Sequence, residues 1–166
     1  MRELKLFIDG EFTDAAGGET YESINPANRE PVATVARGGA EDVARACRAA
    51  QRAFAGEWGA MACAERGAIL AATADLIEER ADEFAELEML DVGKPITEAT
   101  AIDAAAAVGY LRWYAGVTDA AGGETIPLPT GAQIDFSLRR PYGVVGGIAP
   151  WNFPLFLIGR KVAPVL

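Results

Sequence analysis

The first forty residues alternate short apolar runs with turn residues. In "LKLFIDGEFTDA" two apolar runs flank Asp9 and Gly10, a pair of residues that favours a tight hairpin turn. "ETYESI" and "EPVATVA" flank Asn25 and Pro26 in the same way, and two glycines end the unit. The pattern therefore predicts two consecutive hairpins before the first helix.

From Glu41 onward the apolar spacing becomes helical, and the chain continues as a series of helices until "GG" at 122–123. The expected apolar faces are Val43, Cys47, Ala50 and Phe54; then Ile69, Leu70, Thr73, Leu76 and Ile77; and, in a third long helix, Ile102, Ala106, Gly109 and Trp113. Another helix is expected from Ala81 to Asp91, with "DVGKP" ending it. The small residues of the third long helix predict close approach of a neighbouring element.

Two strands of different character are expected after the helices. "QIDFSLRR" alternates apolar and polar residues, which predicts a half-exposed strand. "GVVGGIA" does not alternate, which is typical of a strand covered on both faces in a parallel sheet. We therefore expect an α/β fold with an incomplete doubly wound sheet, divided into residues 1–130, 131–141 and 142–166.

The covered strand runs into "APWNFP", where Asn152 is the one polar side chain in an apolar turn. Open α/β sheets bind ligands at the carboxyl ends of their strands, and Pro154 suits the first position of a following helix. Two interpretations are open: Asn152 caps the free N–H groups of that helix, or its amide N–H points into a cleft as a donor to an oxyanion.

Composition and charge exclude several classes of function. The chain has 166 residues, with 15 basic and 24 acidic side chains and a formal net charge of −9, so a basic nucleic-acid groove is not expected. It has no histidine, which excludes Ser-His and Cys-His pairs within these residues and argues against a zinc site. Cys47 and Cys63 have no basic neighbour arranged to activate them, and we expect both in the core.

No membrane association is expected. The stretch Pro141–Gly159 is uncharged and long enough to cross a bilayer, but Pro150, Pro154 and its glycines would break a spanning helix. Glu3 and Lys5 stand where a signal peptide would have its apolar segment. We therefore expect a cytoplasmic protein.

Several motifs together resemble the NAD(P)-dependent aldehyde dehydrogenase superfamily. "LFIDGEF", "INPAN", "ERGAILAATADLIEERADEFAELEMLDVGKP" and "RRPYGVVGGIAPWN" are similar to segments of that family and occur in the same order, and "APWNFPLFLIGRKVAPVL" is similar to its signature after the first nucleotide-domain strand. The resemblance covers essentially the whole chain and implies the amino-terminal third of the family's fold.

The resemblance also implies a reaction and a cofactor. In this family a cysteine thiolate attacks an aldehyde, a hydride passes to NAD or NADP, and a glutamate activates the water that releases the acid. Carried over to this chain, Asn152 donates to the oxyanion, and the backbone of Ala149, Pro150 and Trp151, with Asn152, borders the cofactor. The nucleotide fingerprint GxGxxG is missing, but this family does not use it.

Two further sites follow from the resemblance, each with a plainer alternative. Ser23, Ile24 and Asp91 match positions that hold a monovalent cation in some members, although Asp91 also suits a helix-end surface carboxylate. The residues Phe153, Phe156, Leu157 and Arg160 share one helix face, similar to the substrate-tunnel wall of members that act on lactaldehyde, glycolaldehyde or succinate semialdehyde. Arg160 alternatively favours a helix end or pairs with an acidic neighbour.

The resemblance ends where the sequence ends. The family's nucleophilic cysteine and its glutamate base belong to segments beyond Leu166, so we expect the chain alone to be inactive. One hypothesis is the amino-terminal part of an enzyme that oxidises a small aldehyde and assembles as a homo-oligomer. The alternative is a non-catalytic binding or assembly partner that complements a fragment or a full-length relative.

Overall fold

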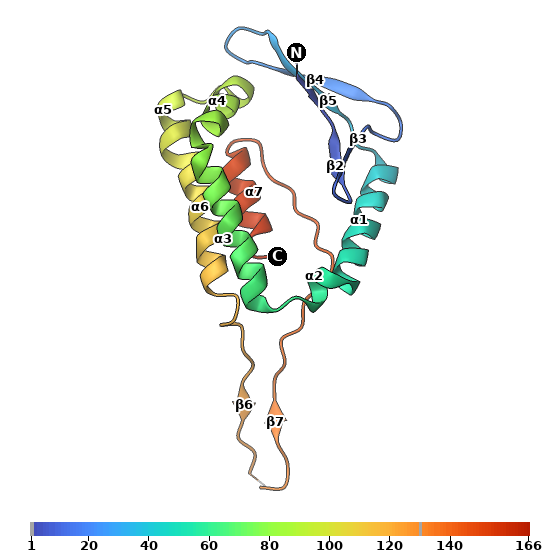
Figure 1. Cartoon of the computed structure of the whole chain (residues 1–166), viewed down its shortest axis with the longest axis vertical. Coiled ribbons are helices and arrows are strands. Elements are labelled where there is room, and N and C mark those ends of the chain that lie inside the picture. Colours follow the sequence, from blue (N-terminus) through green and yellow to red (C-terminus); the bar gives the residue numbers. More distant parts are fainter. Residues whose placement is uncertain (1, 130) are drawn as a thin grey trace.

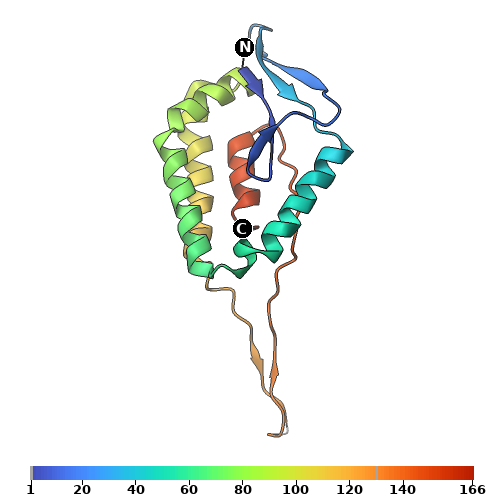
Figure 2. The same cartoon turned by 45° about the vertical axis from the view of Figure 1, so that its right-hand side comes forward.

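The computed structural model describes residues 2–129 and 131–166; Met1 and Thr130, at the ends of the predicted first segment, lie outside the described residues. The strands near the N-terminus lie at one end of the molecule, helices form its middle, and a long two-stranded arm projects from the other end (Figure 1). The turned view shows the same arrangement, with the C-terminus among the helices (Figure 2).

Both predicted hairpins are confirmed. β2 (Leu6–Ile8) pairs antiparallel with β3 (Glu11–Thr13), and Phe7 faces Phe12. The turn residues Asp9 and Gly10 have φ angles of 58° and 81°, the left-handed conformation that a two-residue hairpin of matching twist requires. The Asp-Gly pair therefore fixes the register of this hairpin.

The second hairpin belongs to a three-stranded sheet of order β1-β5-β4. β4 (Thr20–Ile24) runs antiparallel to β5 (Pro31–Ala36), and β1 (Arg2–Leu4) lies parallel to β5 on its other edge. The turn of this hairpin rests on the end of a helix: Gly93 has φ 77°, and a Cβ added to it would lie 2.5 Å from Pro26 Cγ. Only glycine fits there.

The helices follow the predicted order. They are α1 (Ala40–Ala55), α2 (Glu57–Ala60), α3 (Cys63–Glu79), α4 (Ala81–Val92), α5 (Ile96–Glu98), the π-helical turn η1 (Ala99–Asp103), α6 (Ala104–Gly116) and α7 (Pro154–Val162). The main core lies between α3, α6 and α7, where Leu70, Ala74, Val108, Leu111 and Ala163 form one cluster.

The buried face of α6 differs from the predicted one. Its buried residues are Ala104, Ala107, Val108 and Leu111, whereas Ile102, Gly109 and Trp113 are exposed. The π-helical turn immediately before α6 contains an extra residue per turn, which rotates the helix relative to a continuous α-helical spacing. Close approach does occur, at another position: a Cβ added to Gly159 of α7 would lie 3.1 Å from Ala107 Cα.

The expectation that both cysteines lie in the core was wrong. Cys47 and Cys63 are exposed, as is Val43 on the same face of α1 as Cys47. The helix α1 packs mainly against α2 and β2, so most of its apolar face has no covering element among the described residues. Cys63 is the first residue of α3, and Arg66 Nη2 donates to its Sγ at 3.4 Å, so the expectation that no basic group lies beside it was also wrong.

The two expected strands after the helices also differ from prediction. In "QIDFSLRR" only β7 (Asp135–Phe136) is strand, paired antiparallel with β6 (Thr125–Ile126), and the apolar positions Ile134, Phe136 and Leu138 are all exposed. "GVVGGIA" forms no strand and is largely exposed. A strand requires a hydrogen-bonding neighbour, and no strand lies beside this segment within residues 2–129 and 131–166.

Across the described ranges, no helix is both long enough and apolar enough to span a membrane.

Asp42 joins α1 to the strands. It is buried, accepts N–H bonds from Gly39 at 2.9 Å and Ala16 at 3.1 Å, and its pKa is lowered, chiefly by the Gly39 bond. A lowered pKa stabilises the fold above the unfolded value of 3.8, and this contribution is lost as pH falls through the folded value.

We expect Asp42→Ala to lower the melting temperature at pH 7 and the difference from the parent chain to shrink as pH falls below about 3.8. Asp82, also in the first turn of a helix, is exposed, so Asp82→Ala is the matched control and should change the melting temperature little. Thermal unfolding followed by circular dichroism from pH 2.5 to 7 measures both. A difference independent of pH would contradict the ionic role of Asp42.

Candidate functional site

The predicted turn lies at the start of α7. Pro154 takes the first helical position, as expected. The residue at the N-cap is Phe153, and no side chain caps the helix through that position. Asn152 lies one residue before it and is exposed. The capping interpretation of Asn152 is therefore wrong, and its amide remains available to another partner.

The amino-terminal end of α7 is held by a side chain of another helix. Leu155 N–H, at the second helical position, has no acceptor within its own helix and donates to Glu88 Oε1 of α4 at 2.9 Å. A carboxylate here also favours the positive end of the helix dipole. Glu88, rather than Asn152, therefore accepts a hydrogen bond from a free N–H group at the start of α7.

Glu88 belongs to a buried triad with Lys94 and Asp103. Lys94 Nζ lies 3.0 Å from Glu88 Oε2 and 2.7 Å from Asp103 Oδ2, and each of the three residues is at most 8 % exposed. Glu88 comes from α4, Lys94 from the loop after it and Asp103 from η1. Sequence reasoning missed the triad because "DVGKP" was interpreted only as a helix stop.

Lys94 keeps its charge although it is buried. Burial raises the pKa of Glu88, although the Leu155 N–H and Lys94 act in the opposite direction. Burial alone would lower the pKa of Lys94, but its hydrogen bonds to Asp103 and Glu88 outweigh that effect and raise it. The ammonium is therefore charged at neutral pH, between the carboxyl groups of Glu88 and Asp103.

The aromatic residues after Asn152 pack onto this triad and onto α6. Lys94 Nζ lies 3.8 Å from the centre of the Phe153 ring, a cation–π contact. The Phe153 ring meets Phe156 edge-to-face at 6.0 Å, and Phe156 lies 5.6 Å from Tyr110. Of the other predicted substrate-wall residues, Leu157 is half-buried and Arg160 is exposed in the last turn of α7.

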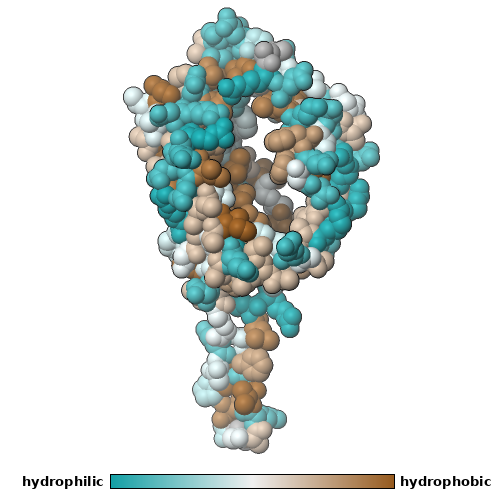
Figure 3. All heavy atoms as spheres, in the orientation of Figure 1, coloured by the Kyte–Doolittle hydropathy of each residue, from teal (hydrophilic) through white to brown (hydrophobic). Residues whose placement is uncertain are grey.

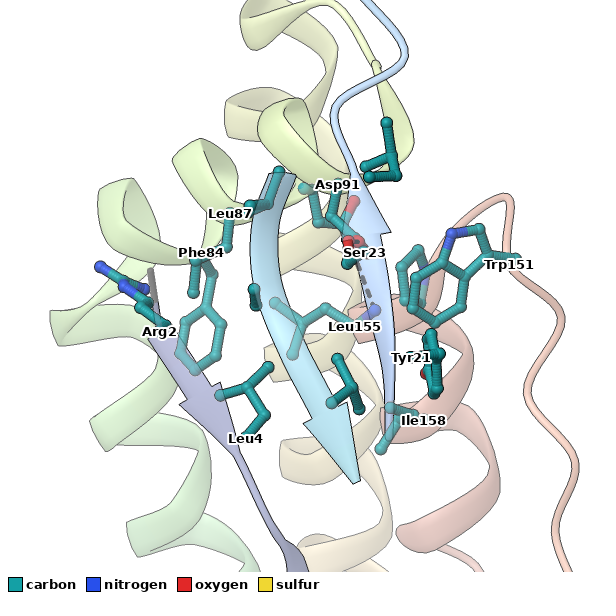
Figure 4. A pocket seen from close by; sticks show the side chains of 16 residues that line it. Arg2, Leu4, Tyr21, Ser23, Phe84, Leu87, Asp91, Trp151, Leu155 and Ile158 are labelled. Carbon is teal, nitrogen blue, oxygen red and sulfur yellow. Dashed lines mark hydrogen bonds between the residues drawn. The ribbon is translucent and has the colours of Figure 1, made fainter. Parts of the chain in front are cut away.

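A cavity of about 650 Å³ lies on the opposite face of α7. Its walls come from the β1-β5-β4 sheet, α4 and α7, and from α7 and the turn before it they include Trp151, Pro154, Leu155 and Ile158 (Figure 4). Apolar residues also border a hollow in the middle of the molecule (Figure 3). The predicted substrate wall of Phe153, Phe156, Leu157 and Arg160 does not line this cavity.

The predicted cation ligands come together at one wall of the cavity. Ser23, Ile24 and Asp91 all line it, and Ser23 Oγ donates a hydrogen bond to Asp91 Oδ1. The ladder between β4 and β5 is irregular at Ser23 and Ile24, which turns backbone groups away from regular pairing. Asp91 is half-buried, so it is more than a helix-end surface carboxylate. Cation binding there stays a prediction.

Lys94→Met is expected to destabilise the chain by about 3 to 5 kcal/mol, because it leaves two buried carboxylates without their partner. Arg112→Gln is the control: Arg112 also bridges two carboxylates, Asp75 and Glu78, but all three are exposed, and exposed pairs contribute little. Urea unfolding of the two variants at pH 7 makes the comparison. If both variants lose the same free energy of unfolding, the buried triad stabilises the chain no more than exposed ion pairs do.

Comparisons with known proteins are consistent with this geometry. The family model "Aldehyde dehydrogenase family" matches residues 12–166. Among curated relatives, "Aldehyde dehydrogenase family 2 member C4" of Arabidopsis thaliana is 44 % identical over 98 % of this chain and 32 % of its own length. "NADP/NAD-dependent aldehyde dehydrogenase PuuC" of Escherichia coli is 42 % identical over 99 % of this chain and 33 % of its own.

Solved structures match equally well. The NAD⁺ complex of aldehyde dehydrogenase from Bacillus cereus superposes with a TM-score of 0.95 at 43 % identity, covering 99 % of this chain and 33 % of that one. A putative aldehyde dehydrogenase from Burkholderia cenocepacia gives a TM-score of 0.93 at 43 % identity, with 97 % and 34 % covered. The chain thus spans about a third of its relatives' length and has the fold of their amino-terminal part, and it belongs to the aldehyde dehydrogenase family.

Proposed function

We propose that this chain supplies the amino-terminal third of an enzyme that oxidises an aldehyde to a carboxylic acid with NAD or NADP. The observation that carries the proposal is the "PWNFP" turn: Asn152 is exposed at the start of α7 and is not used as a cap, in a chain that matches the family from residue 12 to 166. By the complete enzyme we mean a chain of the relatives' length that contains these residues.

In the complete enzyme Asn152 is the oxyanion donor. When a nucleophile attacks the aldehyde carbon, the carbonyl oxygen gains negative charge, and a fixed amide N–H directed at that oxygen stabilises the transition state more than the ground state. An amide suits this role because it donates a hydrogen bond without a change in its own protonation. Removing one such donor lowers turnover by about 10² to 10³ in well-studied enzymes.

The backbone of Ala149, Pro150 and Trp151 is proposed to border the cofactor. No strand pairs with this backbone within the described residues, and Ala149 is half-buried beside the exposed Pro150 and Trp151, so the segment has room for a flat group alongside it. When bound, the nicotinamide supplies a hydride acceptor. The NAD⁺ complex of the Bacillus cereus relative and the name of the Escherichia coli relative support either dinucleotide.

The nucleophile and the base are proposed to come from outside these 166 residues. Cys47 and Cys63 are exposed on α1 and α3, neither lines the cavity beside α7, and the chain has no histidine to activate them. The isolated chain is therefore expected to lack aldehyde oxidation.

A monovalent cation is proposed to bind at Ser23, Ile24 and Asp91. Its support is the meeting of these residues at one wall of the cavity, where the Asp91 carboxyl lies beside the Ser23 hydroxyl. A cation there would hold β4 to the end of α4, in addition to the close contact between Gly93 and Pro26.

The arm formed by β6 and β7 is proposed to be the assembly element, through which the enzyme forms a homo-oligomer or the chain complements another fragment. Its two strands pair only with each other within the described residues, and Ile134, Phe136 and Leu138 are exposed along it. Unpaired edges and exposed apolar side chains are the features that favour pairing with a second chain.

Asn152→Ala in the complete enzyme is expected to lower kcat by about 10² to 10³ without a change in melting temperature, because the side chain is exposed and caps no helix. Absorbance of NAD(P)H with a short aldehyde measures kcat, and differential scanning calorimetry measures stability. Asn28→Ala, in an exposed turn, is the control. If Asn152→Ala leaves kcat unchanged, Asn152 is not the donor to the oxyanion.

Arg160 is proposed to favour small hydroxyaldehydes and semialdehydes, because its guanidinium offers several fixed donors to a carboxylate or hydroxyl. Arg160→Leu should reduce kcat/KM for succinate semialdehyde and lactaldehyde relative to hexanal. Lys161→Leu, on the same turn of α7, controls for loss of charge. If Arg160→Leu leaves the ratio of these kcat/KM values unchanged, Arg160 only stabilises the end of the helix and does not select the substrate.

A further inference from the structure

The position of the buried triad needs an explanation beyond stability. A buried ion pair is seldom more stabilising than apolar residues of the same size, because the charges lose their water. Such groups are best attested where they fix one arrangement of the chain. The question is therefore which part of the molecule Glu88, Lys94 and Asp103 hold in place.

The triad contacts the chain on the carboxyl side of Asn152 at two points. Glu88 Oε1 accepts the Leu155 N–H at 2.9 Å, and Lys94 Nζ lies 3.8 Å from the Phe153 ring. Asp103 has no described contact with the turn. It holds Lys94 Nζ through both carboxylate oxygens, at 2.8 and 2.7 Å. The three side chains form one connected support.

The backbone between these two contacts has little freedom. Pro154 separates Phe153 from Leu155, and its ring fixes its own φ and restricts the residue before it. Phe153 has φ −147° and ψ 66°. With the ring of Phe153 and the N–H of Leu155 both held, the direction in which the chain leaves toward Asn152 is set as well.

We propose that Glu88 and Lys94 are positioning residues that orient the Asn152 amide, Glu88 through the Leu155 N–H and Lys94 through the Phe153 ring. Neither touches the reacting atoms. This inference rests on the proposed oxyanion role of Asn152 and adds the source of its orientation. A displacement of the donor by about 1 Å is enough to cost up to a hundredfold in rate.

Glu88→Gln is the informative replacement, because it keeps the size of the side chain and removes one acceptor. Glu88 now accepts from both Leu155 N–H and Lys94. The amide NH₂ of glutamine must face one of these donors, so one contact is lost. Should this variant fail to fold, Phe153→Leu takes its place, since it removes the ring beside Lys94 and leaves the triad intact.

The experiment is a double-mutant cycle on kcat in the complete enzyme, with Asn152→Ala as the second replacement. Glu88→Gln is expected to lower kcat by about tenfold to a hundredfold and to leave KM for the dinucleotide within about twofold. In the Asn152→Ala background the same replacement should change kcat by less than about twofold, because the group that it positions is gone. Arg112→Gln, which breaks an exposed ion network of α6, should leave kcat unchanged in both backgrounds.

Two results would overturn the inference in different ways. If Asn152→Ala lowers kcat and Glu88→Gln either leaves kcat unchanged or lowers it equally in both backgrounds, the triad does not act through Asn152 and only the positioning role fails. If Asn152→Ala alone leaves kcat unchanged, the oxyanion role itself fails, and the positioning role fails with it.

Discussion

The interaction on which the rest of the site depends is the buried ion triad of Glu88, Lys94 and Asp103. It joins α4, the loop after α4 and η1, and through Leu155 N–H it ties the start of α7 to all three. α7 follows the largely exposed segment 141–150, which pairs with no strand within the described residues, so the placement of α7 depends on side-chain contacts. Packing of Gly159 against Ala107 fixes the distance between α7 and α6, while the triad fixes the end that carries Asn152.

Several other surfaces of the described residues expose apolar side chains. The outer face of α1, the arm and the segment 141–150 all expose apolar side chains, and the cavity beside α7 is lined mainly by apolar ones. A chain that spans about a third of its relatives' length and matches their fold is expected to expose the surfaces that the other two-thirds of those relatives adjoin. The exposure of apolar positions that the sequence predicts to be buried agrees with this expectation.

Local signals in the sequence predicted local structure well. Asp9 with Gly10 formed the turn of the expected hairpin, and Pro154 began a helix. Patterns that depend on distant partners failed: Cys47 and Val43 share a helix face that nothing described covers, and the π-helical turn before α6 rotated its buried stripe. The triad was missed because its members lie on three separate elements, and no spacing along the chain indicates that they meet.

The most direct test of this account is hydrogen exchange at the amide of Leu155. At the second position of α7 this N–H has no intrahelical acceptor, so any protection reports its bond to Glu88. The neighbouring Phe156 N–H, for which no acceptor is recorded among the described residues, is the internal reference. The account predicts slow exchange at Leu155, fast exchange at Phe156, and loss of the difference in Glu88→Ala. Equally fast exchange at both amides in the unaltered chain would contradict it.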